Sequence, residues 1–317
     1  MSTDAHGEAT TRTGHRHLLR WTVGSLTLVL IAALAAAWFV SPRPSDPKAL
    51  VLDRLRAGGG SYVPLDSVAP QMREAVVAAE DERFWRHHGI DVIGLLRAAA
   101  YDVSHLSLRQ GASTITEQLA KDLYLDGNDH SPARKVEDAV VALRLESHLS
   151  KDQILELYLN EVYFGSGAVG VDEASERYFG IPPSQLSLAD ASLLAGMIEA
   201  PTLDDPLSDA PAARDRQAQV LTSMIRDGYI TESEAQHAVA RRLHVPGGIV
   251  VPVDADATVL PGPQISLPIA LAGLAFVAVG LAGSLLARRK HLPVWPAASL
   301  VACAAGLVLV ARAVRAD

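Results

Sequence analysis

Three long apolar runs limit what this chain of 317 residues can form. No Asp, Glu, Lys or Arg occurs at residues 21–42, 257–287 or 292–311. A helix needs roughly 20 apolar residues to cross the hydrocarbon layer of a membrane, and each run is about that long. We therefore predict about three transmembrane helices, at residues 21–42, 263–287 and 293–311, with a single folded domain between the first two.

Basic residues beside these runs predict their orientation, because short cytoplasmic loops carry an excess of Lys and Arg. Such residues stand just before the first run and just after the second, at Arg12, Arg16, Arg20 and 288–290. We expect residues 1–20 to form a cytoplasmic tail and residues 43–256 to lie outside the membrane. The two arginines of the C-terminal tail argue mildly against an outer position for that tail.

The first run has an alternative interpretation as a cleavable secretion signal, since small residues at 35–37 follow a basic tail. We favour an uncleaved anchor. The run is longer than the roughly 7–15 residues of a signal core, and Trp38 and Phe39 stand where a cleavage site needs small residues.

Cysteine content and charge exclude several classes of site. Cys303 is the single cysteine, so neither a disulfide framework nor a cysteine-ligated metal site can form. The net charge is -8, and the outer part has no basic run with interleaved aromatic residues. We therefore expect no nucleic-acid partner.

The part outside the membrane has a helical pattern throughout. Proline, glycine and charge at 43–61 indicate a stalk, and we place the folded domain at residues 62–243, with a linker at 244–262. Apolar spacing predicts an all-α domain with helices at 70–88, 92–104, 113–125, 132–148, 151–162, 170–178, 188–199, 212–228 and 232–243.

The segment AAEDERFWRHHGID combines acidic, aromatic and imidazole side chains. In a helix over 70–88, Glu80, Phe84 and His87 share one face with apolar residues. A carboxylate among apolar neighbours has its charged form disfavoured, which raises its pKa toward that of a general base. The alternative is that Glu80 and Asp81 pair with nearby arginines on a solvated surface, with His87 a packed histidine.

The segment RQGASTITEQLAKDLYL opens a helix with small and hydroxyl-bearing residues. Free backbone N–H groups, the hydroxyls of Ser113 and Thr114 and the helix dipole would favour a phosphate, and Gln118 and Lys121 follow on the helix. Taken alone, an ordinary helix cap with Glu117 and Lys121 as a surface ion pair is the preferred interpretation.

A third segment, ARKVEDAVVALRLE, places Arg134, Lys135, Glu137 and Asp138 in the first turns of a helix. Acidic residues suit the positive end of the helix dipole, whereas the basic pair gains nothing from it. A bound anion would explain the basic pair, and a solvated charged turn is the alternative.

Together these segments resemble the glycosyltransferase family 51 domain of class A penicillin-binding proteins and monofunctional transglycosylases, from about Tyr62 to about Ala240. Five motifs occur in the family's order, namely EDERFWRHHGID, RQGASTITEQLAKDLYL, RKVEDAVVALRLE, SKDQILELYLNEVYFGSGAVGVDEAS and LSLADASLLAGMIEAP. The fold that the resemblance implies is lysozyme-like, with a smaller jaw lobe facing the membrane.

The resemblance also implies roles for individual residues. Glu80 would deprotonate the 4-hydroxyl of the acceptor sugar, and Asp138 would be the second acid. The residues expected to shape the cleft or to contact the donor diphosphate and sugar are Asp81, Phe84, His87, Ser113, Thr114, Gln118, Lys121, Arg134, Lys135 and Glu137. A divalent cation, Mg²⁺ or Mn²⁺, is the one cofactor considered, and no metal ligands are assigned.

Some positions depart from the family's pattern. Asp138 stands where the family usually has Glu, Glu117 and Glu199 stand where it usually has Gln, and Ala112 stands where it often has Gly. Asp138 keeps the charge but is one methylene shorter, and Glu137 points about 100° away around the helix. A lowered or altered activity is therefore part of the expectation.

The reaction implied is polymerisation of lipid II into glycan strands with release of undecaprenyl diphosphate. Fewer than 80 residues follow Ala240, and they contain no Ser-x-x-Lys site, so a transpeptidase is not expected. The chain would lie in the bacterial cytoplasmic membrane with its catalytic domain outside. Its partners would be lipid II, the growing glycan strand, membrane lipid and other cell-wall synthesis proteins. A lytic muramidase and an inactive membrane scaffold are the alternatives.

Overall fold

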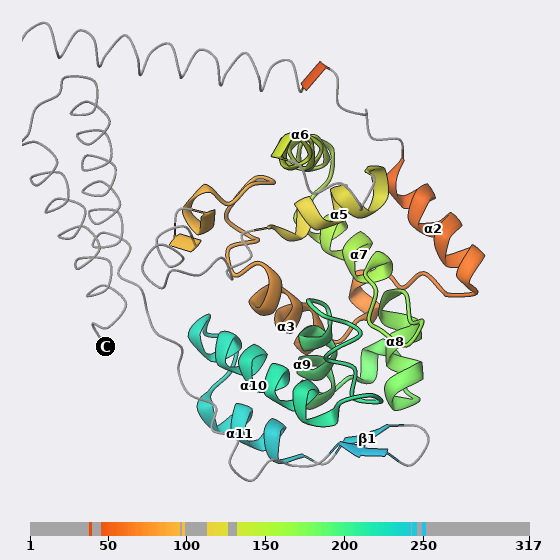
Figure 1. Cartoon of the computed structure of the whole chain (residues 1–317), viewed down its shortest axis with the longest axis vertical. Helices are drawn as coiled ribbons and strands as arrows, with labels where there is room; N and C mark the ends of the chain where they lie inside the picture. Colours follow the sequence, from red (N-terminus) through yellow and green to blue (C-terminus); the bar gives the residue numbers. More distant parts are fainter. Residues whose placement is uncertain are drawn as a thin grey trace, which may run out of the picture.

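A computed structural model describes residues 38–39, 46–95, 97–98, 113–125, 132–241, 243–245 and 249–251 of the chain. They form a helical domain, which confirms the expected helical fold for this part (Figure 1). The predicted spans at 263–287 and 293–311, and that at 21–42 apart from 38–39, lie outside the described residues. Within the described part, no helix combines the length and apolar character that crossing a membrane requires.

The principal helices follow one another with short connections. Their bounds are α2 (Pro47–Gly58), α3 (Pro70–Glu80), α5 (Ile115–Tyr124), α6 (Pro132–His148), α7 (Lys151–Glu161), α8 (Gly170–Phe179), α9 (Leu188–Met197), α10 (Ala210–Arg226) and α11 (Glu232–Ala240). The predicted helices from 132 onward are confirmed, with ends that differ by a few residues. Four helices, α5, α7, α9 and α11, begin with a capping box, which satisfies backbone N–H groups at the helix start.

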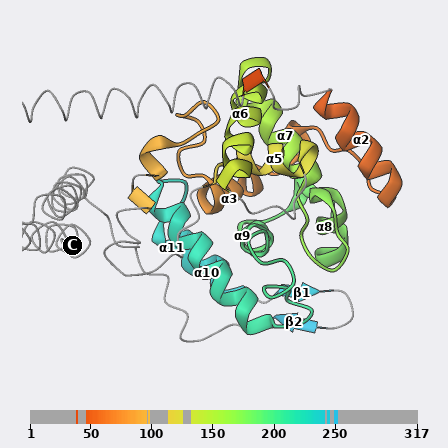
Figure 2. The same cartoon turned by 45° about the horizontal axis from the view of Figure 1, so that its top comes forward.

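Helix α9 lies at the centre of the core. Every residue from Ala189 to Met197 is buried, and α3 and α10 both pack against this helix. Figures 1 and 2 show α3 between α5 on one side and α9 and α10 on the other. The C-terminal end of α3 therefore lies among several helices, where a side chain can be held by groups from distant parts of the sequence.

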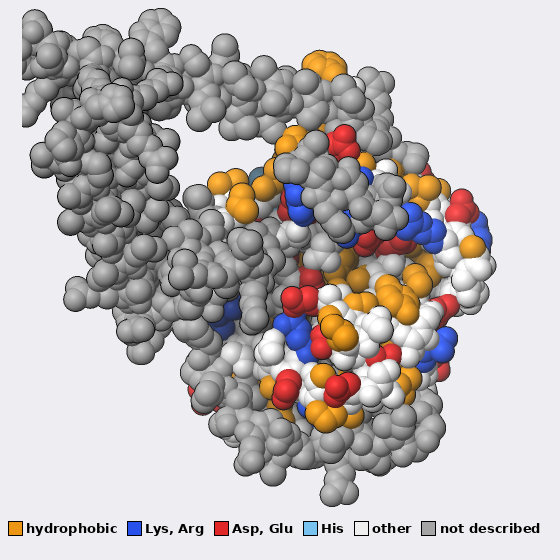
Figure 3. All heavy atoms as spheres, in the orientation of Figure 1, with side chains coloured by type: hydrophobic (Ala, Val, Ile, Leu, Met, Phe, Trp, Pro, Cys, Tyr) orange, Lys and Arg blue, Asp and Glu red, His pale blue; other side chains and the backbone are white. Residues whose placement is uncertain are grey.

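The outer surface mixes side chains of all types. On the face drawn in Figure 3, acidic and basic side chains lie next to one another, with apolar side chains among them. Ion pairs within the described domain include Arg54 with Glu161 and Lys151 with Glu146.

Regular secondary structure continues past both predicted ends of the domain. Residues 47–58, assigned to a stalk, form α2, because Asp46 caps its first turn, Val51 and Leu55 are buried and Gly59 ends it in a left-handed conformation. The proline and glycine taken as linker signals are the start and stop signals of a helix. At the other end, β1 (Leu243–Val245) pairs antiparallel with β2 (Ile249–Val251), so the described domain is not purely helical.

The helix predicted over 70–88 ends at Glu80. The backbone of Asp81 leaves the helical region, with φ -159° and ψ 75°, and turns follow. The helix predicted over 92–104 is observed at 92–95 and 97–98, and its remainder lies outside the described residues.

Candidate active site

Glu80 is the last residue of α3 and is held by a residue of another helix. Its Oε2 accepts a hydrogen bond of 2.8 Å from Gln118 Nε2 on α5. Its Oε1 is buried and accepts no hydrogen bond from any described residue. Burial raises the pKa of the Glu80 carboxyl, while the Gln118 hydrogen bond and the charge of Arg216 act in the opposite direction. A buried carboxylate with one uncommitted oxygen has the properties of a general base.

The predicted helical face shared by Glu80, Phe84 and His87 does not exist, because the helix has already ended. The turn instead buries Phe84, whose ring meets Trp85 edge-on at 4.9 Å and lies under the Lys151 ammonium at 4.3 Å. Phe84 and His87 still lie close to one another, with ring centroids 6.3 Å apart. These residues are brought together by the turn, not by helical spacing.

Asp81 connects this turn to the start of α5. Both of its carboxylate oxygens lie 2.9 Å from His87 Nε2, and Oδ2 also accepts from the backbone N–H of Ile115 at 3.1 Å. Asp81 and His87 are both buried. The alternative that Asp81 pairs with a nearby arginine on a solvated surface is not observed. Arg83 pairs with Asp91 instead.

The start of α5 is built around Thr114. Its hydroxyl accepts from the Glu117 N–H at 3.1 Å and donates to the Gly89 carbonyl at 2.7 Å, while the Glu117 carboxylate accepts from the Thr114 N–H. Glu117 is buried, which raises its pKa, and it completes a helix cap. It therefore does not form the predicted surface ion pair with Lys121, which lies one turn beyond Gln118.

A second charged group lies at the start of α6 and reaches α5. Arg134 Nε donates to Asp138 Oδ1 at 3.0 Å, and Lys135 Nζ lies 3.5 Å from Asp138 Oδ2. Lys135 also donates to Ser113 Oγ at 2.9 Å. Asp138, although one methylene shorter than Glu, thus reaches both cations, whereas Glu137 is half-buried on another side of the helix.

These contacts make α5 the link between the carboxylate and the cations. Ser113, two residues before α5 begins, contacts Lys135, and Gln118 on α5 contacts Glu80. The structure therefore brings most of the predicted residues into one region formed by α3, α5 and α6.

The donor set in this region offers no evident metal site. In the part of the chain that the structure describes, no group of three or more His, Cys, Asp or Glu side chains is arranged to hold a metal ion. Asp138 is already engaged by two cations, so its carboxylate is poorly placed to bind another. The expected Mg²⁺ or Mn²⁺ thus lacks a set of ligands among these residues.

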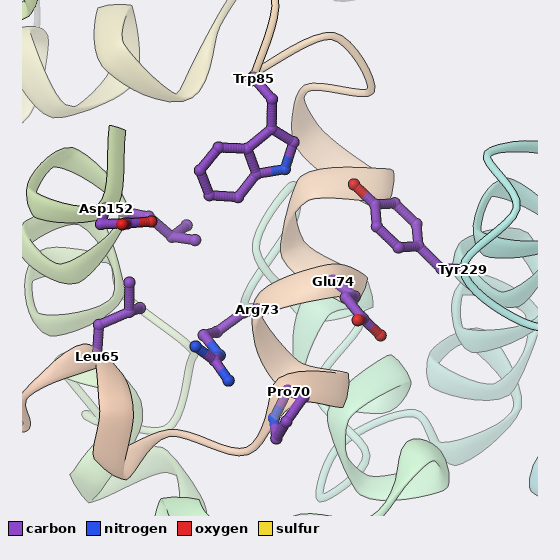
Figure 4. Close-up of a pocket in the computed structure, with 8 residues that line it drawn as sticks. Leu65, Pro70, Arg73, Glu74, Trp85, Asp152 and Tyr229 are labelled. Carbon is purple, nitrogen blue, oxygen red and sulfur yellow. The ribbon is translucent and has the colours of Figure 1, made fainter. Parts of the chain in front are cut away.

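A separate cavity of about 300 Å³ lies beside α3 (Figure 4). Figure 4 shows the ring nitrogen of Trp85 pointing toward the hydroxyl of Tyr229 at one side of it. Glu80 is not among the lining residues, which include Leu65, Arg73, Glu74, Trp85, Asp152 and Tyr229. The cavity is therefore distinct from the region around Glu80.

Comparison with known proteins identifies the family. The Transglycosylase family model matches residues 50–225, which is more than half of the 317 residues. The chain belongs to the transglycosylase family. A Cupriavidus necator protein named "Putative transglycosylase" is 42% identical over 184 residues, covering 58% of this chain and 79% of that protein. Penicillin-binding protein 1A of Escherichia coli is 42% identical over 172 residues, covering 54% of this chain and 20% of that protein.

Family membership confirms the resemblance and makes this transglycosylase a glycosyltransferase of peptidoglycan. The match begins at residue 50, within α2, which agrees with a domain that starts before Tyr62. The transglycosylase spans only 20% to 25% of the penicillin-binding protein 1A relatives from Escherichia coli and Aquifex aeolicus. The solved penicillin-binding protein 1A from Haemophilus influenzae shares 26% identity over 41% of this chain and 16% of that chain, with a TM-score of 0.29 that is too low to compare folds.

Three residues near Glu80 were not among the predicted site residues of the transglycosylase. Tyr158 on α7 donates to Gln118 Oε1 at 2.9 Å. Arg216 on α10 pairs with Glu199, and the charges of both act on Glu80. The apolar spacing of α7 indicates that Tyr158 is a core residue, but the partner of its hydroxyl depends on how α5 packs against α7.

Proposed function

We propose that this transglycosylase polymerises lipid II into glycan strands and releases undecaprenyl diphosphate. The observation that carries the proposal is the Glu80 carboxylate, which is buried at Oε1, holds one hydrogen bond at Oε2 and has a raised pKa. A raised pKa makes this carboxylate a stronger proton acceptor, and an inverting attack by a sugar hydroxyl requires such a base.

The step forms one bond and breaks one. The 4-hydroxyl oxygen of the acceptor sugar attacks the anomeric carbon of the donor, and its proton passes to Glu80. The bond between that carbon and the diphosphate oxygen breaks, and the diphosphate leaves with the electron pair. General-base catalysis of this kind typically contributes roughly 10²–10⁴-fold to the rate.

The cations of α5 and α6 would stabilise the departing diphosphate. Lys135 and Arg134 lie at the start of α6, and Lys121 lies on α5, which connects this group to Glu80. Preorganised cations lower the energy of a developing negative charge without reorganisation of solvent. Asp138 would keep the two α6 cations in place.

The remaining features follow from the substrate and from the apolar runs. Lipid II carries a polyprenyl tail, so we propose that the enzyme is anchored beside the membrane with its catalytic domain outside. We also propose a smaller jaw lobe at the membrane, a single glycosyltransferase activity, and contact with other cell-wall synthesis proteins. Residues 46–241 would form most of the catalytic domain.

The deciding experiment replaces the carboxylate of Glu80 by an amide. Glu80→Gln keeps the shape of the side chain and removes the base, so glycan synthesis from labelled lipid II by the purified full chain should fall by roughly 10²-fold or more. The control is Glu176→Gln on α8, which removes an exposed carboxylate and should leave synthesis unchanged.

Near-normal synthesis by the Glu80→Gln protein would overturn the assignment of the base. Analysis of the products distinguishes the alternatives. A muramidase would shorten preformed glycan, and an inactive scaffold would form no polymer even as the wild-type protein.

A further inference from the structure

Three side chains from three helices form a hydrogen-bonded chain that ends at Glu80. Tyr158 on α7 donates its hydroxyl proton to Gln118 Oε1 at 2.9 Å, and Gln118 Nε2 on α5 donates to Glu80 Oε2 at 2.8 Å. Tyr158 is 1% exposed. Because a phenol, an amide and a carboxylate follow one another, each hydrogen bond has a defined donor and acceptor.

The orientation of the Gln118 amide in this chain of hydrogen bonds depends on Tyr158. The amide of Gln118 can rotate by half a turn, and its oxygen would then face the carboxylate of Glu80, which is repulsive while Glu80 is charged. Burial and the nearby charge of Glu80 raise the pKa of Tyr158 well above 10, so its hydroxyl remains a donor. A donor at this position binds the amide oxygen and leaves the amide nitrogen facing Glu80.

We propose that Tyr158 is a positioning residue that fixes the Gln118 amide, so that Glu80 Oε2 keeps its hydrogen bond and Oε1 takes the proton of the acceptor hydroxyl. The inference rests on the proposed function of Glu80. Oε1 is the oxygen left for this task, since it accepts no hydrogen bond from a described residue. A carboxylate with both oxygens occupied would be a weaker base.

Other charged groups also act on Glu80. Asp81 follows it in the chain, Arg216 faces it from α10 and Glu199 from the segment after α9. Tyr158 and Gln118 face it from α7 and α5 and carry no charge. Replacing Tyr158 by Phe changes none of the charges, so an altered titration of Glu80 reports on the orientation of the amide.

The experiment measures the pH dependence of glycan synthesis by the full chain. Tyr158→Phe keeps the ring and removes the hydroxyl, so Gln118 loses its anchor and Glu80 loses an aligned donor. Because that donor favours the charged form, the pKa of Glu80 should rise further. The acid limb of the pH profile of kcat should move to higher pH by roughly one unit, and KM should change little.

Two further variants separate positioning from stability. Tyr178→Phe also removes a buried hydroxyl, which donates to the Phe164 carbonyl, and it should leave the acid limb in place. In a Gln118→Met protein the amide is absent, so Tyr158→Phe should cause no additional shift. A shift of equal size in the Gln118→Met protein, or an unshifted limb in Tyr158→Phe, would overturn the proposal.

A second readout does not need activity. Carboxyl carbon resonances of the glutamate-labelled full chain can be titrated, with Glu80→Gln identifying the signal of Glu80. A higher midpoint in Tyr158→Phe than in the wild type supports the positioning role even if no polymer forms. Equal midpoints contradict it, whatever the outcome of the polymerisation assay.

Discussion

Arg134 Nε donates a hydrogen bond of 3.0 Å to Asp138 Oδ1, one helical turn further along α6, and both side chains are buried. Lys135 approaches the other oxygen of the same carboxylate. Removing one partner of a buried ion pair leaves the other charge without compensation, which usually costs more than the pair contributes. Asp138→Asn should therefore lower the free energy of unfolding by about 3 kcal/mol in chemical denaturation.

Two further substitutions serve as controls for this prediction. Asp138→Glu retains the charge and adds one methylene, so its effect should stay near 1 kcal/mol. Glu176→Gln removes an exposed carboxylate and should stay within about 0.5 kcal/mol of the wild type. Equal losses in Asp138→Asn and Glu176→Gln would show that the α6 ion pair contributes nothing to stability.

The raised pKa of Glu80 predicts a cost in stability at neutral pH. A carboxyl whose pKa is higher in the folded state than in the unfolded state binds more protons when folded. Its charge therefore destabilises the fold as pH rises from the ordinary glutamate pKa of 4.5 through the folded pKa. Glu80→Gln should stabilise the protein at pH 7 by roughly 1.4 kcal/mol for each unit of the rise.

The gain should largely disappear near pH 4, where Glu80 is protonated in both states. Denaturation curves of the wild type and the Glu80→Gln protein at the two pH values test this. A Glu80→Gln protein that is less stable than the wild type at pH 7 would indicate that the charged form of Glu80 is favoured by folding.

Helix positions could be predicted from the sequence because they depend on local signals. Ser150 and Ser187 precede apolar repeats, and the helices that follow them begin where these caps predict. The end of α3 could not be predicted in this way. Asp81 leaves the helix while bound to His87 and to the N–H of Ile115, which is 34 residues away, so the turn depends on tertiary contacts.

The residues of the candidate site could also be predicted only in part from the sequence. The acidic and basic residues of the three motifs were recognised from their order along the chain, and the structure brings many of them together. Tyr158, whose hydroxyl binds Gln118, lies in the fourth of the five quoted motifs, for which no site residue was predicted. Its hydroxyl acquires a role only when α5 packs on α7, which periodicity alone does not specify.

Thr114 should contribute to stability through its hydroxyl. Thr114→Val keeps the branched shape but removes the acceptor for the Glu117 N–H and the donor for the Gly89 carbonyl. The loss of a helix cap and of a buried hydrogen bond should lower the free energy of unfolding by about 2 kcal/mol. Thr114→Ser keeps the hydroxyl and should recover most of the loss, and a serine variant as unstable as the valine variant would refute this role.

Gly89 should be required because α6 passes close to it. Its φ is +93°, and an added Cβ would lie 3.1 Å from the backbone carbon and oxygen of Ala142. A helix backbone cannot give way as a side chain can, so Gly89→Ala should displace α6, which carries Lys135 and Asp138.

The matched control is Gly180→Ala, where φ is +66° but nothing lies within 4 Å of the added atom, so only the left-handed backbone cost of about 1 kcal/mol applies. Gly89→Ala should lose about 2 kcal/mol more than the control in chemical denaturation and most of its glycan synthesis, because overpacking adds to the backbone cost. Equal losses in the two proteins would mean that α6 can move away from residue 89 without disturbing the site.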